Sequence, residues 1–163
     1  LWGDGLMRLD QMYQEVILDH YRNPHGKGLV EPFDTQVHHV NPTCGDEITL
    51  RVRLTGEPGE ETVESVSFDS QGCSISQASA SVLHDQVEGL SLAQAMSALD
   101  EFSALMRSAT EDVTPDEDLL GDAIAFEGVS QYPARIKCAL LAWMAFKDAA
   151  IQATTGTEQA GVV

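Results

Sequence analysis

Three cysteines and one aspartate are the residues of this chain whose types suit metal or sulfur chemistry. Cys44 and Asp46 stand two apart across a glycine, and Cys73 and Cys138 follow far along the chain. Three thiolates and one carboxylate match the four positions of a tetrahedral zinc site, and thiolates also suit iron–sulfur clusters. The spacing lacks paired C-x-x-C knuckles. Both metals therefore stay open at this point, as does the alternative of buried core cysteines and a turn aspartate.

The strand that follows Asp46 predicts where its side chain points. Apolar residues alternate with polar ones over 48–54, which is typical of a half-buried strand. Residues two apart in an extended chain share a face, so Cys44 and Asp46 are expected on the same side as Ile48. Gly45 between them gives the backbone extra freedom.

The other two cysteines are predicted on helices. Cys73 lies at the junction between a strand and a segment of helical period, so the positive end of the helix dipole favours its thiolate form. Cys138 lies inside the last predicted helix, after the cations Arg135 and Lys137, which also favour a thiolate.

Histidines offer alternative ligands. His38 and His39 adjoin the Cys44 segment, but adjacent strand residues point to opposite faces, so one of them at most reaches a shared site. His84 lies on the helix predicted after Cys73. A satisfied or exposed histidine is the alternative for each of them.

The order of elements predicts an α+β fold, with a small antiparallel three-stranded sheet packed against helices. A helix ends before Asn23-Pro24, and a turn separates each strand from the next. The strands are predicted at 35–41, 48–54 and 63–69. Helices are predicted after Cys73, after Ser91, from a Thr114 cap in "TPDE" and from Pro133, with a loop over 121–132. Residues 7–153 are expected to form one domain, 1–6 an N-terminal extension or expression remnant, and 154–163 a flexible tail.

Net charge and cysteine number limit the classes of partner and the cellular compartment expected for this chain. Nine basic and 26 acidic side chains give a net charge of −17, which disfavours nucleic acid and anionic membrane surfaces and suits a basic protein partner. The odd number of widely spaced cysteines disfavours a secreted disulfide framework. With no secretory signal or long apolar run in the sequence, a cytoplasmic location is expected.

Four motifs together resemble the NifU/IscU family, and within it the SufU branch. They read "MYQEVILDHYRNPHGKG", "NPTCGDEITL", "SFDSQGCSISQASASVL" and "YPARIKCALLAWMAFKDA". The resemblance runs from about Met12 to about Ala150, in one order along nearly the whole chain. It implies a small antiparallel sheet packed with helices, in agreement with the pattern of the sequence.

The segment before Cys138 favours the SufU branch. Classical IscU scaffolds carry a double proline and then a histidine directly before the third cysteine, whereas this chain has Lys137 there. A lysine ammonium is a poor zinc ligand at neutral pH. The resemblance implies one zinc ion per chain, held at Cys44, Asp46, Cys73 and Cys138.

The same resemblance implies a zinc-dependent sulfurtransferase. A SufS-type cysteine desulfurase forms a persulfide, Cys44 accepts its outer sulfur, and the sulfur passes on to the SufBCD assembly complex. Arg135, three residues before Cys138, is expected to orient the site or the partner, with a plain surface cation as the alternative. Two other functions stay open: an IscU-type scaffold that carries a transient iron–sulfur cluster, and a structural zinc domain.

Overall fold

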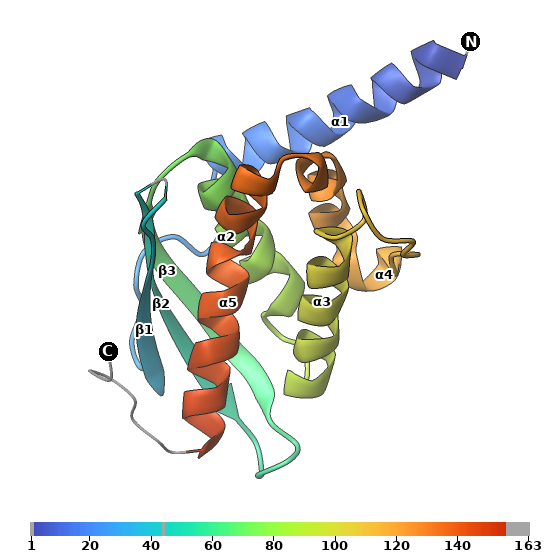
Figure 1. The fold of residues 1–163 in the computed structure, drawn as a ribbon. Coiled ribbons are helices and arrows are strands. Elements are labelled where there is room, and N and C mark those ends of the chain that lie inside the picture. Colours follow the sequence, from blue (N-terminus) through green and yellow to red (C-terminus); the bar gives the residue numbers. More distant parts are fainter. Residues whose placement is uncertain (1, 44, 156–163) are drawn as a thin grey trace.

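A three-stranded antiparallel sheet forms one layer of the molecule (Figure 1). The structure is a computed structural model that describes residues 2–43 and 45–155, with side chains from residue 11 onward. The strands lie side by side in chain order: β1 (Thr35–Asn41), β2 (Asp46–Thr55) and β3 (Thr62–Gln71). All three predicted strands are confirmed, each within two residues of its expected start and end.

Alternation along β2 explains why the sheet has one buried face. Asp46, Ile48, Leu50 and Val52 are at most 1% exposed, whereas the residues between them are only half-buried. Side chains of successive strand residues point to opposite faces, so the apolar set turns toward the helices. The predicted shared face of Asp46 and Ile48 is therefore present.

Helices cover that buried face. Figure 1 shows α5 and α2 against the sheet, α1 across one end of the molecule, and α3 and α4 further out. The helices are α1 (Trp2–Arg22), α2 (Ser74–Val87), α3 (Leu92–Leu105), α4 (Glu117–Leu120), the 3₁₀ helix η1 (Gly121–Gln131) and α5 (Pro133–Thr155). The predicted α+β class is confirmed.

Aromatic side chains join α3, η1 and α5 in the core. Trp143 stacks on Phe102 with ring centroids 4.5 Å apart, and Phe126 meets Phe102 edge-on at 5.9 Å. The Trp143 indole Nε1–H donates to Ser79 Oγ at 3.1 Å, so its polar atom is satisfied inside the core. This packing fixes α5, and with it Cys138.

Two predictions between α3 and α5 are wrong. The short acidic helix is capped by Asp116 rather than Thr114, because the Asp116 carboxylate accepts from the backbone N–H groups of Asp118 and Leu119. The segment predicted as a loop forms η1. Phe126 and other apolar residues of this segment are buried against the core and hold the helix in place.

The ends of the chain bear on the expected domain limits. Helix α1 starts at Trp2 and so includes most of the segment that was expected to be an extension. Helix α5 continues to Thr155, and residues 156–163 lie outside the described part. The domain limits 7–153 stay a prediction. None of the helices within the described ranges combines the length and apolarity needed to cross a bilayer.

Candidate metal centre

The β1–β2 turn presents Asp46 at the start of β2, where it pairs in register with Asn41. Gly45 has φ +74°, a left-handed conformation that glycine adopts without strain, and its N–H donates to the Asn41 carbonyl at 2.9 Å. The backbone N–H of Thr43 donates to Asn41 Oδ1 at 3.2 Å. These bonds close the turn and aim the Asp46 carboxylate inward, where it is 1% exposed.

Cys73 occupies the N-cap position of α2 and is hydrogen-bonded to Asp46. Its backbone N–H donates to Asp46 Oδ1 at 2.9 Å, and its Sγ lies 3.7 Å from Asp46 Oδ2. The Ser76 hydroxyl donates to the Cys73 carbonyl at 3.1 Å, and Cys73 Sγ lies 3.9 Å from Ser76 Oγ. The positive end of the helix dipole faces both the sulfur and the carboxylate, and it favours negative charge there.

Gly72 makes room for this arrangement. A Cβ atom at position 72 would overlap Oδ1 of Asp46 and would lie 2.8 Å from Ser76 Oγ. Any other residue would push the carboxylate off the Cys73 N–H. Gly72 is absent from the residues predicted for the site, although its place directly before Cys73 was a usable signal in the sequence.

Cys138 completes the described group from α5. Its side chain is buried at 2% exposure, and its Sγ lies 3.7 Å from the Ala134 carbonyl. One donor atom each from Asp46, Cys73 and Cys138 lies within 4.8 Å of the other two. Figure 1 shows the β1–β2 turn and the starts of α2 and α5 at the same end of the molecule. Cys44 lies outside the described residues.

The donor set fits zinc. Two sulfurs and a carboxylate from three separate elements converge without a disulfide between them, and sulfur and oxygen are both zinc ligands. The Asn41 side chain beside them is 7% exposed, and its Nδ2 has no hydrogen-bond partner in the described structure. A buried donor of this kind costs about 1–3 kcal/mol when left unpaired, which points to an acceptor supplied by the occupied site.

Arg135 lies beside the group but outside it. Its side chain is exposed and makes no hydrogen bond or ion pair within the described ranges. It lines a depression of about 470 Å³, together with Tyr13, Ser74, Val129 and Tyr132 among others. Ser74 directly follows Cys73, so this depression adjoins the metal group.

The predicted alternative histidine ligands are engaged elsewhere. His38 Nδ1 lies 2.8 Å from Thr49 Oγ1 on the open face of the sheet, and His39 Nε2 lies 2.9 Å from Asp148 Oδ2 on α5. His84 Nδ1 lies 2.7 Å from the Val66 carbonyl. Within the described residues, none of the three belongs to the group around Cys73.

Comparison with known proteins places this geometry in a family. The model of the NifU-like N-terminal domain matches residues 12–139, which span all three described donors. The chain belongs to the NifU-like N-terminal domain family. The resemblance drawn from the four motifs is confirmed, including its SufU branch.

Relatives within this family carry two kinds of name. The zinc-dependent sulfurtransferase SufU of Bacillus subtilis is 43% identical over 139 residues, which cover 85% of this chain and 89% of that protein. The iron–sulfur cluster assembly scaffold protein IscU of Streptococcus pyogenes is 38% identical over 145 residues, covering 89% of this chain and 86% of that one.

Solved structures share the fold. A candidate iron–sulfur cluster assembly scaffold for the SUF system, from Fervidobacterium islandicum, superposes with a TM-score of 0.71 at 33% identity. The alignment covers 83% of this chain and 93% of that one. A NifU-like N-terminal domain from Brucella abortus gives a TM-score of 0.75 at 24% identity over 91% of this chain and 98% of that one, and it supports the fold alone.

Proposed function

We propose that this protein is a zinc-dependent sulfur acceptor of iron–sulfur cluster assembly. Cys44, Asp46, Cys73 and Cys138 hold one zinc ion, and Cys44 accepts sulfur from a cysteine desulfurase. The observation that carries the proposal is the convergence of Asp46, Cys73 and Cys138, with donor atoms within 4.8 Å of one another. The name of the Bacillus subtilis relative supports the same chemistry.

A zinc ion bound at this site would hold the thiolates without oxidising them, because zinc has no redox chemistry. Asp46 acts as the fixed ligand, because its Oδ1 also accepts the Cys73 N–H and its carboxylate fills the space that Gly72, which has no side chain, leaves open. Cys73 and Cys138 are anchored at α2 and in α5. Cys44 is the ligand that we propose as the sulfur acceptor.

The transfer step balances without an external oxidant. The Cys44 thiolate attacks the outer sulfur of the donor cysteine persulfide, a new S–S bond forms on Cys44, and the donor leaves as a thiolate. The sulfane sulfur moves with its oxidation state unchanged. The unpaired Nδ2–H of buried Asn41, three residues before Cys44, is a suitable hydrogen-bond donor to the sulfur carried there.

Arg135 is proposed as a positioning residue for the donor. Its guanidinium is free of partners in the described structure and borders the depression that begins at Ser74. A cation at that place can hold an acidic or carbonyl group of the docked desulfurase through several N–H donors at once. The depression is large enough for a short peptide segment.

The proposed partners follow from this chemistry. A SufS-type cysteine desulfurase donates the sulfur and the SufBCD complex receives it, while nucleic acid and membrane surfaces are not expected partners of a chain with net charge −17. A cytoplasmic location fits a protein that depends on reduced thiols.

Stimulation of the desulfurase tests the proposal. Zinc-loaded wild-type protein should raise turnover of a SufS-type enzyme, and Cys44→Ala should abolish the effect. Thr43→Ala is the matched control, because Thr43 is an exposed neighbour in the same turn, and it should stimulate like wild type. Equal stimulation by Cys44→Ala would refute the acceptor role.

A second function is an iron–sulfur scaffold. The names of the Streptococcus and Fervidobacterium relatives favour it, and the same thiolates would hold a transient cluster. Anaerobic reconstitution with iron and sulfide separates the two functions. A stable chromophore that transfers intact to an apo-protein would favour the scaffold over the sulfur acceptor.

A further inference from the structure

A second group of potential metal ligands lies apart from the cysteines. His20 is near the end of α1, His25 is in the loop that follows, and Asp85 is on α2. One donor atom from each lies within 4.8 Å of the other two. The imidazole rings have centroids 5.0 Å apart. Two imidazoles and one carboxylate form a nitrogen and oxygen donor set that suits first-row divalent transition ions.

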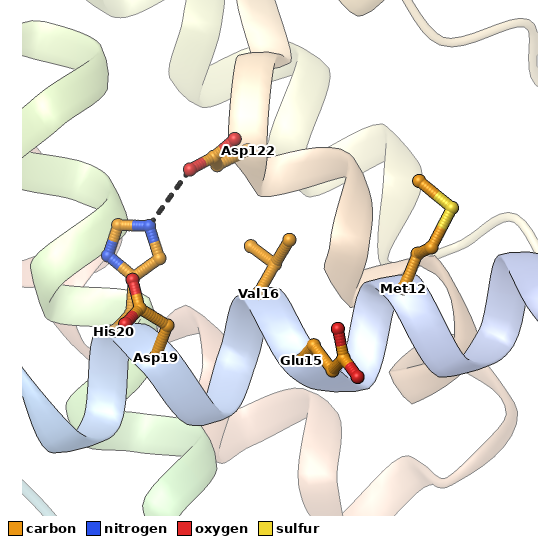
Figure 2. A pocket seen from close by; sticks show the side chains of 6 residues that line it. All are labelled: Met12, Glu15, Val16, Asp19, His20 and Asp122. Atoms are coloured by element: carbon orange, nitrogen blue, oxygen red, sulfur yellow. Dashed lines mark hydrogen bonds and ion pairs between the residues drawn. The ribbon is translucent and has the colours of Figure 1, made fainter.

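The His20 ring is held in a defined orientation. The residue is 2% exposed, and its Nε2 lies 3.0 Å from Asp122 Oδ2 (Figure 2). A carboxylate can only accept, so Nε2 donates to it, and the tautomer that makes this bond has its lone pair on Nδ1. A histidine that ligates a metal commonly donates its other N–H to a carboxylate in this way.

One turn of α2 fixes both imidazoles. Ser81 Oγ lies 2.7 Å from His20 Nδ1 and accepts the backbone N–H of His25 at 2.8 Å. Asp85, four residues later on the same helix face, has Oδ2 2.6 Å from His25 Nδ1. The two rings are thereby held side by side before any ion is bound, which lowers the entropic cost of binding one.

Access and charge favour a cation. The side chains of His25 and Asp85 are 47% and 32% exposed, so one side of the group opens to solvent. On the other side, His20 borders a depression that is also lined by Glu15, Asp19 and Asp122, with no lysine or arginine among its described lining residues (Figure 2). Carboxylates around an opening raise the local concentration of cations.

We propose that His20, His25 and Asp85 form a second metal site, which binds a divalent first-row transition ion. The ion takes the lone pair of His20 Nδ1, and the Ser81 side chain rotates to another rotamer and gives up its hydrogen bonds to His20 Nδ1 and the His25 N–H, because its Oγ now lies where the ion binds. Water completes the coordination. Calcium and magnesium ions are not expected at this site, because they prefer oxygen donors at every coordination position. The proposed site uses none of the cysteines, so the proposal does not depend on whether the protein transfers sulfur.

Cobalt titration of the untagged, zinc-loaded protein tests this second site. Wild type should bind one Co²⁺ per chain in addition to its zinc. The new absorption should consist of weak visible d–d bands, without the near-ultraviolet charge transfer that a thiolate ligand produces. His25→Gln and Asp85→Asn should each weaken Co²⁺ binding by about tenfold or more, as loss of a metal-site group does.

His38→Gln is the matched control. It removes an exposed imidazole from the open face of the sheet and should leave Co²⁺ binding unchanged. Circular dichroism and zinc content should match wild type in all three variants, since the changed side chains are at least partly exposed. The proposal is overturned if no second ion binds in millimolar excess. It is also overturned if the two ligand variants bind Co²⁺ as tightly as wild type.

Discussion

The two ligand clusters of this molecule differ in chemistry and in how the chain builds them. The cluster of Asp46, Cys73 and Cys138 brings together a strand and two helices around soft sulfur donors, and two of its three residues are fully buried. The cluster of His20, His25 and Asp85 joins one helix, a loop and another helix around harder donors, and two of its three residues are exposed. The proposed zinc site is thus buried and offers soft sulfur donors, whereas the proposed second site is open and offers harder nitrogen and oxygen donors.

Their surroundings differ as well. The depression beside the cysteine cluster carries Arg135, whereas the depression beside His20 is lined by three carboxylates. A protein partner with an anionic or carbonyl group suits the first, and a small cation suits the second. The comparison predicts that changes in one cluster leave the other intact.

Loss of a cysteine is expected to have the largest effect. Cys73→Ser and Cys138→Ser should each abolish stoichiometric zinc and lower the midpoint of thermal unfolding, because binding of a structural zinc is coupled to folding. The Co²⁺ uptake of the histidine cluster should persist at temperatures where the variants stay folded. Zinc analysis and differential scanning calorimetry measure both effects, with Ser74→Ala as control. One full zinc in Cys138→Ser would break the proposed ligand set.

Gly72→Ala tests the room around Asp46. The added Cβ overlaps the Asp46 carboxylate, so the variant should lose zinc affinity and about 1–3 kcal/mol in free energy of unfolding. Gly128→Ala is the matched control, because a Cβ there meets nothing within 4 Å. Chemical denaturation and a competition assay with a zinc chelator provide the measurements. If Gly72→Ala binds zinc like wild type, Asp46 is not a ligand held in this position.

Arg135→Ala separates docking from metal binding. Removal of the guanidinium should raise the desulfurase KM for this protein by about tenfold, the size expected for a lost charged contact of 1–2 kcal/mol, with kcat and zinc content unchanged. Lys147→Ala removes an exposed cation further along α5 and should change neither parameter. An equal rise in KM for both variants would mean that Arg135 acts only through the net charge of the protein.

The His39–Asp148 pair, which belongs to neither cluster, gives the smallest expected effect on stability. Burial raises the pKa of Asp148, but hydrogen bonds from His39 and Gln152 and the charge of His39 outweigh it, so the pKa lies below 3.8. A carboxyl with a lowered pKa stabilises the fold above its unfolded-state pKa, and this contribution disappears as pH falls through the folded-state value.

Asp148→Asn should therefore cost well under about 1 kcal/mol near neutral pH, with wild type and variant converging in stability below about pH 4. Denaturation of the metal-free proteins across this range measures the difference. With a single imidazole, this pair should take up no Co²⁺. A stability difference that grows as pH falls below about 4 would have the wrong sign for a lowered Asp148 pKa.

The sequence predicted the cysteine cluster better than the histidine cluster, for a physical reason. Strand alternation over 48–54 set the face of Asp46, and the change to helical period after Cys73 set that residue at a helix start. His25 and Asp85 are 60 positions apart, and only the packing of the loop on α2 brings them together. Spacing along the chain carries no signal for such a pair.

Other misses have the same origin. The helix η1 depends on burial of Phe126 and its apolar neighbours, which local propensity does not reveal. Helix α4 is capped by Asp116 rather than by Thr114, because the Asp116 carboxylate accepts hydrogen bonds from two backbone N–H groups of the helix. The role of Gly72 follows from its distance to Asp46 across 26 residues of chain, which no local motif encodes.

Mass spectrometry of the zinc-loaded protein after turnover with a SufS-type desulfurase and cysteine is the most direct test of sulfur transfer to Cys44. We expect a mass increase of one sulfur atom, which peptide mapping under non-reducing conditions assigns to Cys44 and to neither Cys73 nor Cys138. A chain that stimulates the desulfurase but carries no added sulfur, or carries it on Cys73 or Cys138, would refute Cys44 as the sulfur acceptor.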